Sequence, residues 1–142
     1  VDATIGGYRN FELTQMRLEG AEGKCLAVEE QGVPTYDELI FIANPASLDR
    51  ARTARFLHAV ERGAQYMVNH PEEAWALFSA TAPDLQDELN SEAWKATLPR
   101  FSQSPAALDQ GRYARFESFL LEAGLIDKAL PVSDLALDVG TP

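Results

Sequence analysis

Three side chains able to recognise a small molecule follow a pair of glycines near the beginning of the chain. Tyr8, Asn10 and Glu12 stand two residues apart, directly after Gly6 and Gly7. A tyrosine ring can stack on a planar heterocycle, an asparagine amide can donate and accept, and a carboxylate accepts hydrogen bonds from an amine. A helical turn would place residues 8 and 12 on one face, whereas an extended chain would place all three there. Either geometry lets Tyr8 and Glu12 face one ligand.

The segment before these side chains has the pattern of a strand. Val1, Ala3 and Ile5 alternate with smaller or polar residues, and the two glycines then allow a sharp turn. A strand that ends in glycines and delivers polar and aromatic side chains to the next element commonly builds a ligand site in α/β proteins. The chain starts inside this pattern and without a methionine, so we expect it to be part of a longer protein.

The clearest strand pattern lies at residues 38–44, ELIFIAN, before Pro45. Four contiguous apolar residues, 39–42, are typical of a strand covered on both faces, and such strands belong to sheets with helices on either side. A shorter strand is predicted at residues 24–29, followed by a turn at 31–34. Tyr36 follows this turn and could close over a ligand, although packing on the surface is an equal alternative.

The remaining sequence is patterned as helices. A first short helix is predicted at 10–18, and Ser47 can cap a long helix with Asp49 in its first turn. Pro71 suits the first turn of the next helix, where Trp75 and Phe78 should pack together, and Asp109 can cap the last one. The sequence therefore predicts an α/β fold with a few strands at its N-terminal end and several helices behind them, at residues 47–69, 72–79, 84–98 and 109–123.

The composition excludes several kinds of function. The 142 residues carry a net charge of −10, which argues against nucleic acids and anionic membranes as partners. Cys25 is the single cysteine and the two histidines form no H-E-x-x-H motif, so we expect no disulfide and no metal site. Motifs for phosphate binding or nucleophilic catalysis are also absent from the sequence. We therefore predict no catalytic residues and no cofactor from these motifs.

Two motifs in this order, GGYRNFE at 6–12 and GVPTYDELIFIANP at 32–45, resemble the NMT1/THI5-like (SsuA/THI5-like) family. Within it they are similar to solute-binding proteins for thiamin pyrimidine precursors that serve ABC importers. HPEEAWALF at 70–78, the stretch at 108–126 and LALDV at 135–139 extend the resemblance over nearly the whole chain. It covers only the C-terminal portion of the family's longer proteins.

The resemblance implies the C-terminal part of a type II periplasmic-binding-protein fold, in which two lobes close on a ligand. Residues 1–37 would belong to the second lobe, 38–46 would form a hinge or return strand, and 47–142 would form the C-terminal helical part of one partial domain. The resemblance also implies that Tyr8, Asn10 and Glu12 line the cleft. Tyr8 would stack, Asn10 would orient the ligand, and Glu12 would accept from the exocyclic amine of a 4-aminopyrimidine.

The function implied is the capture of a formylaminopyrimidine or hydroxymethylpyrimidine and its delivery to an ABC permease in the membrane. The parent protein would then be periplasmic or an extracytoplasmic lipoprotein. The alternative within the family is a cytoplasmic pyrimidine synthase that uses pyridoxal phosphate and iron, with its reactive lysine and histidine outside this chain. A third possibility is another small ring or an organic anion, although Glu12 would repel an anion. An isolated lobe would expose apolar surface, so a homodimer is also expected.

Overall fold

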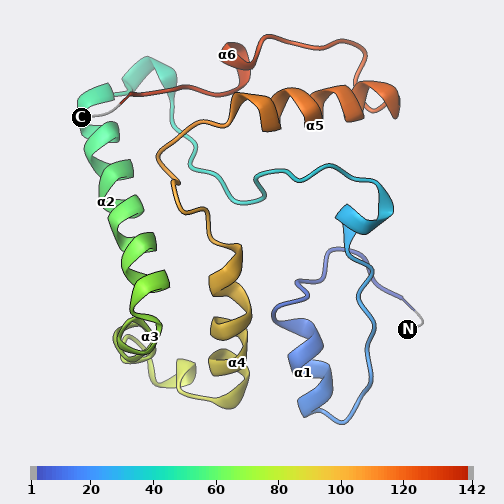
Figure 1. Ribbon diagram of the computed structural model, residues 1–142, viewed down its shortest axis with the longest axis vertical. Coiled ribbons are helices and arrows are strands. Elements are labelled where there is room, and N and C mark those ends of the chain that lie inside the picture. The colour runs from blue at the N-terminus through green and yellow to red at the C-terminus, as the bar shows by residue number, and fades with distance from the viewer. Residues whose placement is uncertain (1–2, 141–142) are drawn as a thin grey trace. The chain divides into compact units, whose positions relative to one another are not determined.

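The computed structural model describes residues 3–140, and helices are their regular secondary structure (Figure 1). These residues gather into two compact units. Unit 1 comprises the chain up to Cys25 together with Arg62–Gln103. Unit 2 comprises Leu26–Glu61 together with the chain from Ser104 onward.

Unit 1 is built from helices that pack through a small aromatic cluster. Trp75 and Phe78 lie on one helix and Trp94 on another, with ring centroids 5.3 Å apart for Phe78–Trp94 and 6.1 Å apart for Trp75–Phe78. The predicted contact between Trp75 and Phe78 is thus confirmed. α1 lies beside α4 (Figure 1). The elements of unit 1 are α1 (Glu12–Leu18), the second part of α2 (Arg50–Asn69), α3 (Pro71–Ser79), α4 (Glu88–Thr97) and the 3-10 turns Pro83–Leu85 and Leu98–Arg100.

Unit 2 combines helices with long extended segments. Phe41 of one such segment meets Phe56 of α2 edge to face, with ring centroids 5.1 Å apart. Arg50, at the start of α2, donates from Nη2 to the carbonyl oxygen of Asp138 at 2.7 Å and so holds the segment after α6. The elements of unit 2 are the first part of α2, α5 (Gln110–Glu122), α6 (Val132–Leu135) and the 3-10 turns Val28–Gln31 and Pro45–Ser47.

Aspartate side chains define where three of the helices begin. Asp49, Asp87 and Asp109 accept hydrogen bonds from the backbone N–H groups three residues ahead, at 2.9, 2.8 and 2.9 Å. These bonds satisfy donors that a helix cannot pair internally. The prediction that Asp109 caps the last long helix is confirmed. The prediction of Ser47 as the cap of the long helix is wrong, because Ser47 lies in a 3-10 turn and α2 begins only at Arg50.

The prediction of an α/β fold with N-terminal strands is wrong, since residues 3–140 contain helices and no strand. Ile5 of the first expected strand is fully exposed, and Val1 lies outside the described residues. Part of the second expected strand forms the 3-10 turn that starts at Val28. A strand needs a neighbouring backbone to pair with, and the helices around these segments use their own backbone groups internally.

The third expected strand, residues 38–44, is extended but unpaired. Among the described residues, no backbone hydrogen bond joins residues 35–43 to another segment. Its apolar side chains are therefore mostly in solvent, with exposed fractions of 84% for Leu39 and 88% for Ile42. The apolar run that predicted a buried strand instead forms an exposed apolar segment, defined here as Leu39–Ile42.

We predict that acid weakens the helix starts at Asp49 and Asp87. The backbone N–H groups of Arg52 and Asn90 lower the pKa of these two carboxyls below the ordinary 3.8. Carboxyls with a depressed folded-state pKa stabilise the fold above pH 3.8, and this contribution is lost as the pH falls through the folded-state pKa. Circular dichroism at 222 nm should show helix loss in this range. The double substitution Asp49→Asn and Asp87→Asn, which keeps a capping oxygen that does not titrate, should reduce this loss, and an unchanged acid profile would contradict the prediction.

Candidate functional site

The chain enters a helical turn at Tyr8, before α1 itself begins. The carbonyl oxygen of Tyr8 accepts hydrogen bonds from the backbone N–H groups of Phe11 at 2.8 Å and Glu12 at 2.9 Å. Of the two geometries considered from the sequence, the backbone therefore adopts the helical one. Residues 8 and 12 lie one turn apart on the same face, and residue 10 lies on a different face.

The carboxylate of Glu12 has an unsatisfied oxygen. Glu12 is half-buried, its Oε2 is shielded from solvent, and no residue among 3–140 donates a hydrogen bond to it. A buried polar atom without a partner costs free energy, about 1–3 kcal/mol and more for a charged group, so such atoms are rare in folded proteins. Glu12 thus carries an unpaired acceptor, which a ligand with an N–H donor could satisfy once a rotation of the side chain exposes Oε2.

The side chain of Tyr8, one backbone turn before Glu12, remains accessible. Its exposed fraction is 48%, so Tyr8 is not a core residue. An accessible tyrosine ring, one helical turn from an unsatisfied carboxylate, combines a stacking surface with an acceptor. We refer to Tyr8 and Glu12 together as the Tyr8–Glu12 face.

Asn10 turns toward α4 instead. Its Nδ2 donates to Oγ1 of Thr97 at 2.6 Å, and this hydroxyl donates to the carbonyl oxygen of Ala93 at 2.7 Å. A hydroxyl has one proton, which Ala93 receives, so Thr97 can only accept from Asn10 and the orientation of the Asn10 amide is fixed. The structure thus places Tyr8 and Glu12 one backbone turn apart and ties the same turn to α4 through Asn10.

Thr97 is a residue that the sequence did not indicate. It lies 87 positions from Asn10, and no local pattern marks it as the partner of an asparagine. A second, weaker tie between the same helices is the ion pair of Arg17 with Glu88 at 3.8 Å, whose side chains are both well exposed. The part-buried Asn10–Thr97 hydrogen bond is therefore the more specific link between α1 and α4.

The loop that follows α1 lies against the side chains of Leu13 and Met16. A Cβ atom at Gly23 would lie 2.7 Å from Sδ of Met16 and 3.2 Å from Leu13, so this loop approaches α1 closely because position 23 is a glycine. Beside this contact a hollow of about 400 Å³ is lined by Leu13, Arg17, Ala21, Glu22 and Gly23. None of the predicted site residues lines it.

Tyr36 belongs to unit 2 and already has an aromatic partner. Its ring stacks on Phe116 of α5, with centroids 4.8 Å apart and planes inclined by 28°. The neighbouring Asp37 forms an ion pair with Nη1 of Arg112, also in α5. These contacts fix the segment around Tyr36 against α5, and its predicted role in covering a ligand stays a prediction.

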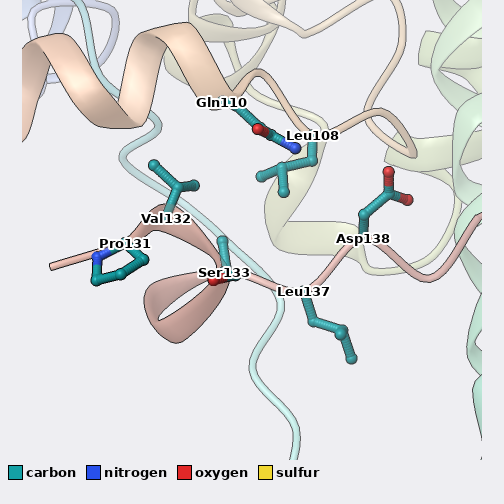
Figure 2. A pocket seen from close by; sticks show the side chains of 8 residues that line it. Leu108, Gln110, Pro131, Val132, Ser133, Leu137 and Asp138 are labelled. Atoms are coloured by element: carbon teal, nitrogen blue, oxygen red, sulfur yellow. The ribbon is translucent and has the colours of Figure 1, made fainter.

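A hollow of about 510 Å³ in unit 2 lies between the start of α5, α6 and the segment after α6 (Figure 2). Its polar groups are largely engaged within the chain: Oδ1 of Asp138 accepts from the N–H of Gly140 at 2.8 Å, and the Asp138 carbonyl accepts from Arg50. It therefore presents no unsatisfied group comparable to Glu12. The lining residues are Leu108, Gln110, Pro131, Val132, Ser133, Ala136, Leu137 and Asp138.

The described residues hold neither a cluster of metal ligands nor a helix that could span a membrane. Within residues 3–140, no group of three or more histidine, cysteine, aspartate or glutamate side chains is placed to hold a metal ion. None of the helices in this range has the length and apolar character needed to cross a membrane. The Tyr8–Glu12 face is accordingly the candidate site that we consider further.

Comparison with known proteins identifies the family to which the chain is similar. A family model described as NMT1/THI5 like matches residues 1–74. A Haemophilus influenzae protein named for thiamine biosynthesis is 44% identical over 140 residues, which are 98% of this chain and 45% of that protein. No solved structure matches the chain.

Two more distant relatives have different names. The formylaminopyrimidine-binding protein of Halalkalibacterium halodurans is 34% identical over 63% of this chain and 26% of its own length. A 4-amino-5-hydroxymethyl-2-methylpyrimidine phosphate synthase of Legionella pneumophila is 28% identical over 81% of this chain and 39% of its own length. The chain thus spans less than half the length of each of these three relatives.

We predict that Thr97→Val loosens the turn that carries Tyr8 and Glu12. Valine keeps the shape of threonine but leaves Asn10 without its acceptor, which should lower the free energy of unfolding by about 1–2 kcal/mol. Denaturant unfolding measures this loss, and hydrogen exchange at Phe11 and Glu12 should become faster. Thr97→Ser retains the hydroxyl and serves as the control. Equal exchange rates in the two variants would contradict the link.

Proposed function

Since the chain belongs to the NMT1/THI5-like family, we propose that it binds a thiamin-type aminopyrimidine through the Tyr8–Glu12 face. Its relatives support a function connected with thiamin pyrimidines. The observation that carries the proposal is the shielded Oε2 of Glu12, to which no described residue donates. A ligand that supplies an N–H group to this oxygen would remove the cost of leaving it unpaired.

A 4-aminopyrimidine has the chemistry that this face requires. Its exocyclic amine donates to a carboxylate, and a protonated ring nitrogen beside the amine would add a second, charge-assisted hydrogen bond. Its planar ring can stack on the accessible ring of Tyr8. A phosphate or a carboxylate ligand would be repelled by Glu12, so the proposal favours a neutral or cationic ring.

Asn10 contributes to this site indirectly in our proposal. Its amide is engaged with Thr97, so it orients the ligand by holding the turn that carries Tyr8 and Glu12 against α4. This arrangement keeps two flexible side chains on a fixed backbone, which lowers the entropy that binding must remove. Direct contact of Asn10 with the ligand is not required.

The form of the function that we favour is the substrate-binding component of an ABC importer. Such a protein would work outside the cytoplasm, hold a formylaminopyrimidine or hydroxymethylpyrimidine, and release it to a permease in the membrane. The Halalkalibacterium relative, named as a formylaminopyrimidine-binding protein, supports this choice. Recognition by stacking and hydrogen bonding needs no covalent step, which suits the two side chains at the site.

The synthase named among the relatives gives the alternative function. Such an enzyme would form a covalent adduct between a lysine and pyridoxal phosphate, which absorbs visible or near-ultraviolet light. Mixing pyridoxal phosphate with the protein, expressed at the length that its gene encodes, separates the alternatives. A stoichiometric lysine adduct would favour the synthase, and tight reversible binding of an aminopyrimidine without it would favour the importer.

We predict that Glu12→Gln weakens binding of 4-amino-5-hydroxymethyl-2-methylpyrimidine by roughly 10- to 100-fold, because a charge-assisted hydrogen bond is lost. Tyr8→Ala should cost roughly tenfold through lost stacking. Isothermal titration calorimetry on the protein at its encoded length measures both. Glu19→Gln, at the other end of α1, changes the charge equally and should leave the affinity unchanged.

Two results would contradict this proposal. If Glu12→Gln and Glu19→Gln bind as tightly as the unsubstituted protein, the Tyr8–Glu12 face is not the site. If the 4-oxo analogue of the pyrimidine binds as tightly as the 4-amino compound, the proposed hydrogen bond between the amine and Glu12 is absent.

A further inference from the structure

The charge of Glu12 is the feature of the Tyr8–Glu12 face that the proposed function leaves without a counter-charge. Its Oε2 is shielded and receives no hydrogen bond from residues 3–140. Arg17, the cation of α1, pairs with Glu88 at 3.8 Å. Lys95, the cation of α4, pairs with Glu92 at 2.7 Å. The cations of these two helices thus serve other carboxylates, and within the described residues Glu12 belongs to no ion pair.

A shielded carboxylate without a positive partner is costly, because it loses hydration and gains nothing in return. A neutral ligand would donate an N–H group to Glu12 but would leave its negative charge uncompensated. A cationic ligand would supply the donor and the missing positive charge together, in a stronger charge-assisted hydrogen bond. The charge state of the ligand therefore matters at this carboxylate.

A 4-aminopyrimidine becomes a cation when a ring nitrogen takes up a proton. The positive charge is then delocalised onto the exocyclic amine, whose N–H groups become stronger donors to a carboxylate. The face of a tyrosine ring also attracts a cation through the negative potential above its π system, and the side chain of Tyr8 is 48% exposed. Both side chains of the Tyr8–Glu12 face thus favour the protonated ring over the neutral one.

The charge of the chain acts in the same direction. The chain carries a net charge of −10, and a negative potential raises the local concentration of a cation but not that of a neutral molecule. We therefore propose, resting on the proposed function, that the Tyr8–Glu12 face binds the aminopyrimidine as its cation. Binding from a solution in which the free ligand is neutral then takes up one proton for each ligand bound.

The charged groups close to Glu12 along the chain and on the packed helix do not titrate in the range that tests this proposal. Carboxylates ordinarily titrate in acid, and arginine and lysine in strong base, so these groups keep their charge between about pH 7 and pH 9. A change of affinity in this range therefore reports protonation of the ligand. The charged side chains of this turn, of the rest of α1, of the loop that lines the hollow beside it and of α4 are Arg9, Arg17, Glu22, Glu88, Glu92 and Lys95.

Isothermal titration calorimetry in two buffers measures the proton uptake. The protein at its encoded length is titrated with 4-amino-5-hydroxymethyl-2-methylpyrimidine in phosphate and in Tris, whose ionisation enthalpies differ widely. At a pH one unit above the measured pKa of the free ligand, the difference in heat should correspond to uptake of about one proton. Above that pKa the affinity should fall about tenfold for each pH unit.

Two substitutions locate the origin of this uptake. Glu12→Gln removes the charge that selects the cation, so binding should become weaker, independent of pH in this range, and free of proton uptake. Glu19→Gln, at the other end of α1, is the matched control and should keep both the uptake and the pH dependence. Proton uptake that persists unchanged in Glu12→Gln would overturn the proposal.

Failure of this proposal is distinguishable from failure of the proposed function. If Glu12→Gln weakens binding but the unsubstituted protein takes up no proton, the ligand is bound as the neutral ring. The cation proposal is then wrong, while the Tyr8–Glu12 face remains the site. If Glu12→Gln binds as tightly as the unsubstituted protein, the proposed site is wrong and the cation proposal is wrong with it.

Discussion

Backbone hydrogen bonding is the constraint on which this structure depends. An α-helix pairs its own N–H and C=O groups, whereas an extended segment must find a partner or remain in water. The described part of the chain satisfies this condition with helices, and Asp49, Asp87 and Asp109 cap the first N–H groups of three of them. The extended segment at residues 35–43 forms no backbone hydrogen bond to another described segment, and it exposes the apolar side chains of Leu39 and Ile42 more fully than any helix exposes its own.

The candidate site is also identified by whether polar groups have hydrogen-bond partners. Polar groups elsewhere are engaged: Asn10 with Thr97, Asp37 with Arg112, and Asp138 with Gly140. Against this background the shielded oxygen of Glu12, without a partner in the described residues, is an exception that a ligand can explain. The turn that carries Tyr8 and Glu12 is tied to α4 by Asn10, and in our proposal this turn presents both side chains to the ligand.

Local signals in the sequence predicted local features of the structure. The cap at Asp109, Pro71 at the start of α3 and the pairing of Trp75 with Phe78 all depend on neighbours within a few residues. The strands could not be predicted in this way. An apolar run such as ELIFIAN indicates a preference for pairing with a neighbouring strand, but it does not indicate whether such a strand is present. The bond from Asn10 to Thr97 spans 87 positions, and only the packing of α1 on α4 reveals it.

The exposed apolar segment also bears on the lifetime of the protein. Proteases bind their substrates as extended chains, and a segment without internal hydrogen bonds can enter such an active site without local unfolding. An enzyme that cleaves after large aromatic residues would find the bond after Phe41 accessible, whereas bonds inside α2 or α5 would be protected by their helices. Any partner that pairs with residues 38–44 would therefore cover an accessible cleavage site as well as an apolar surface.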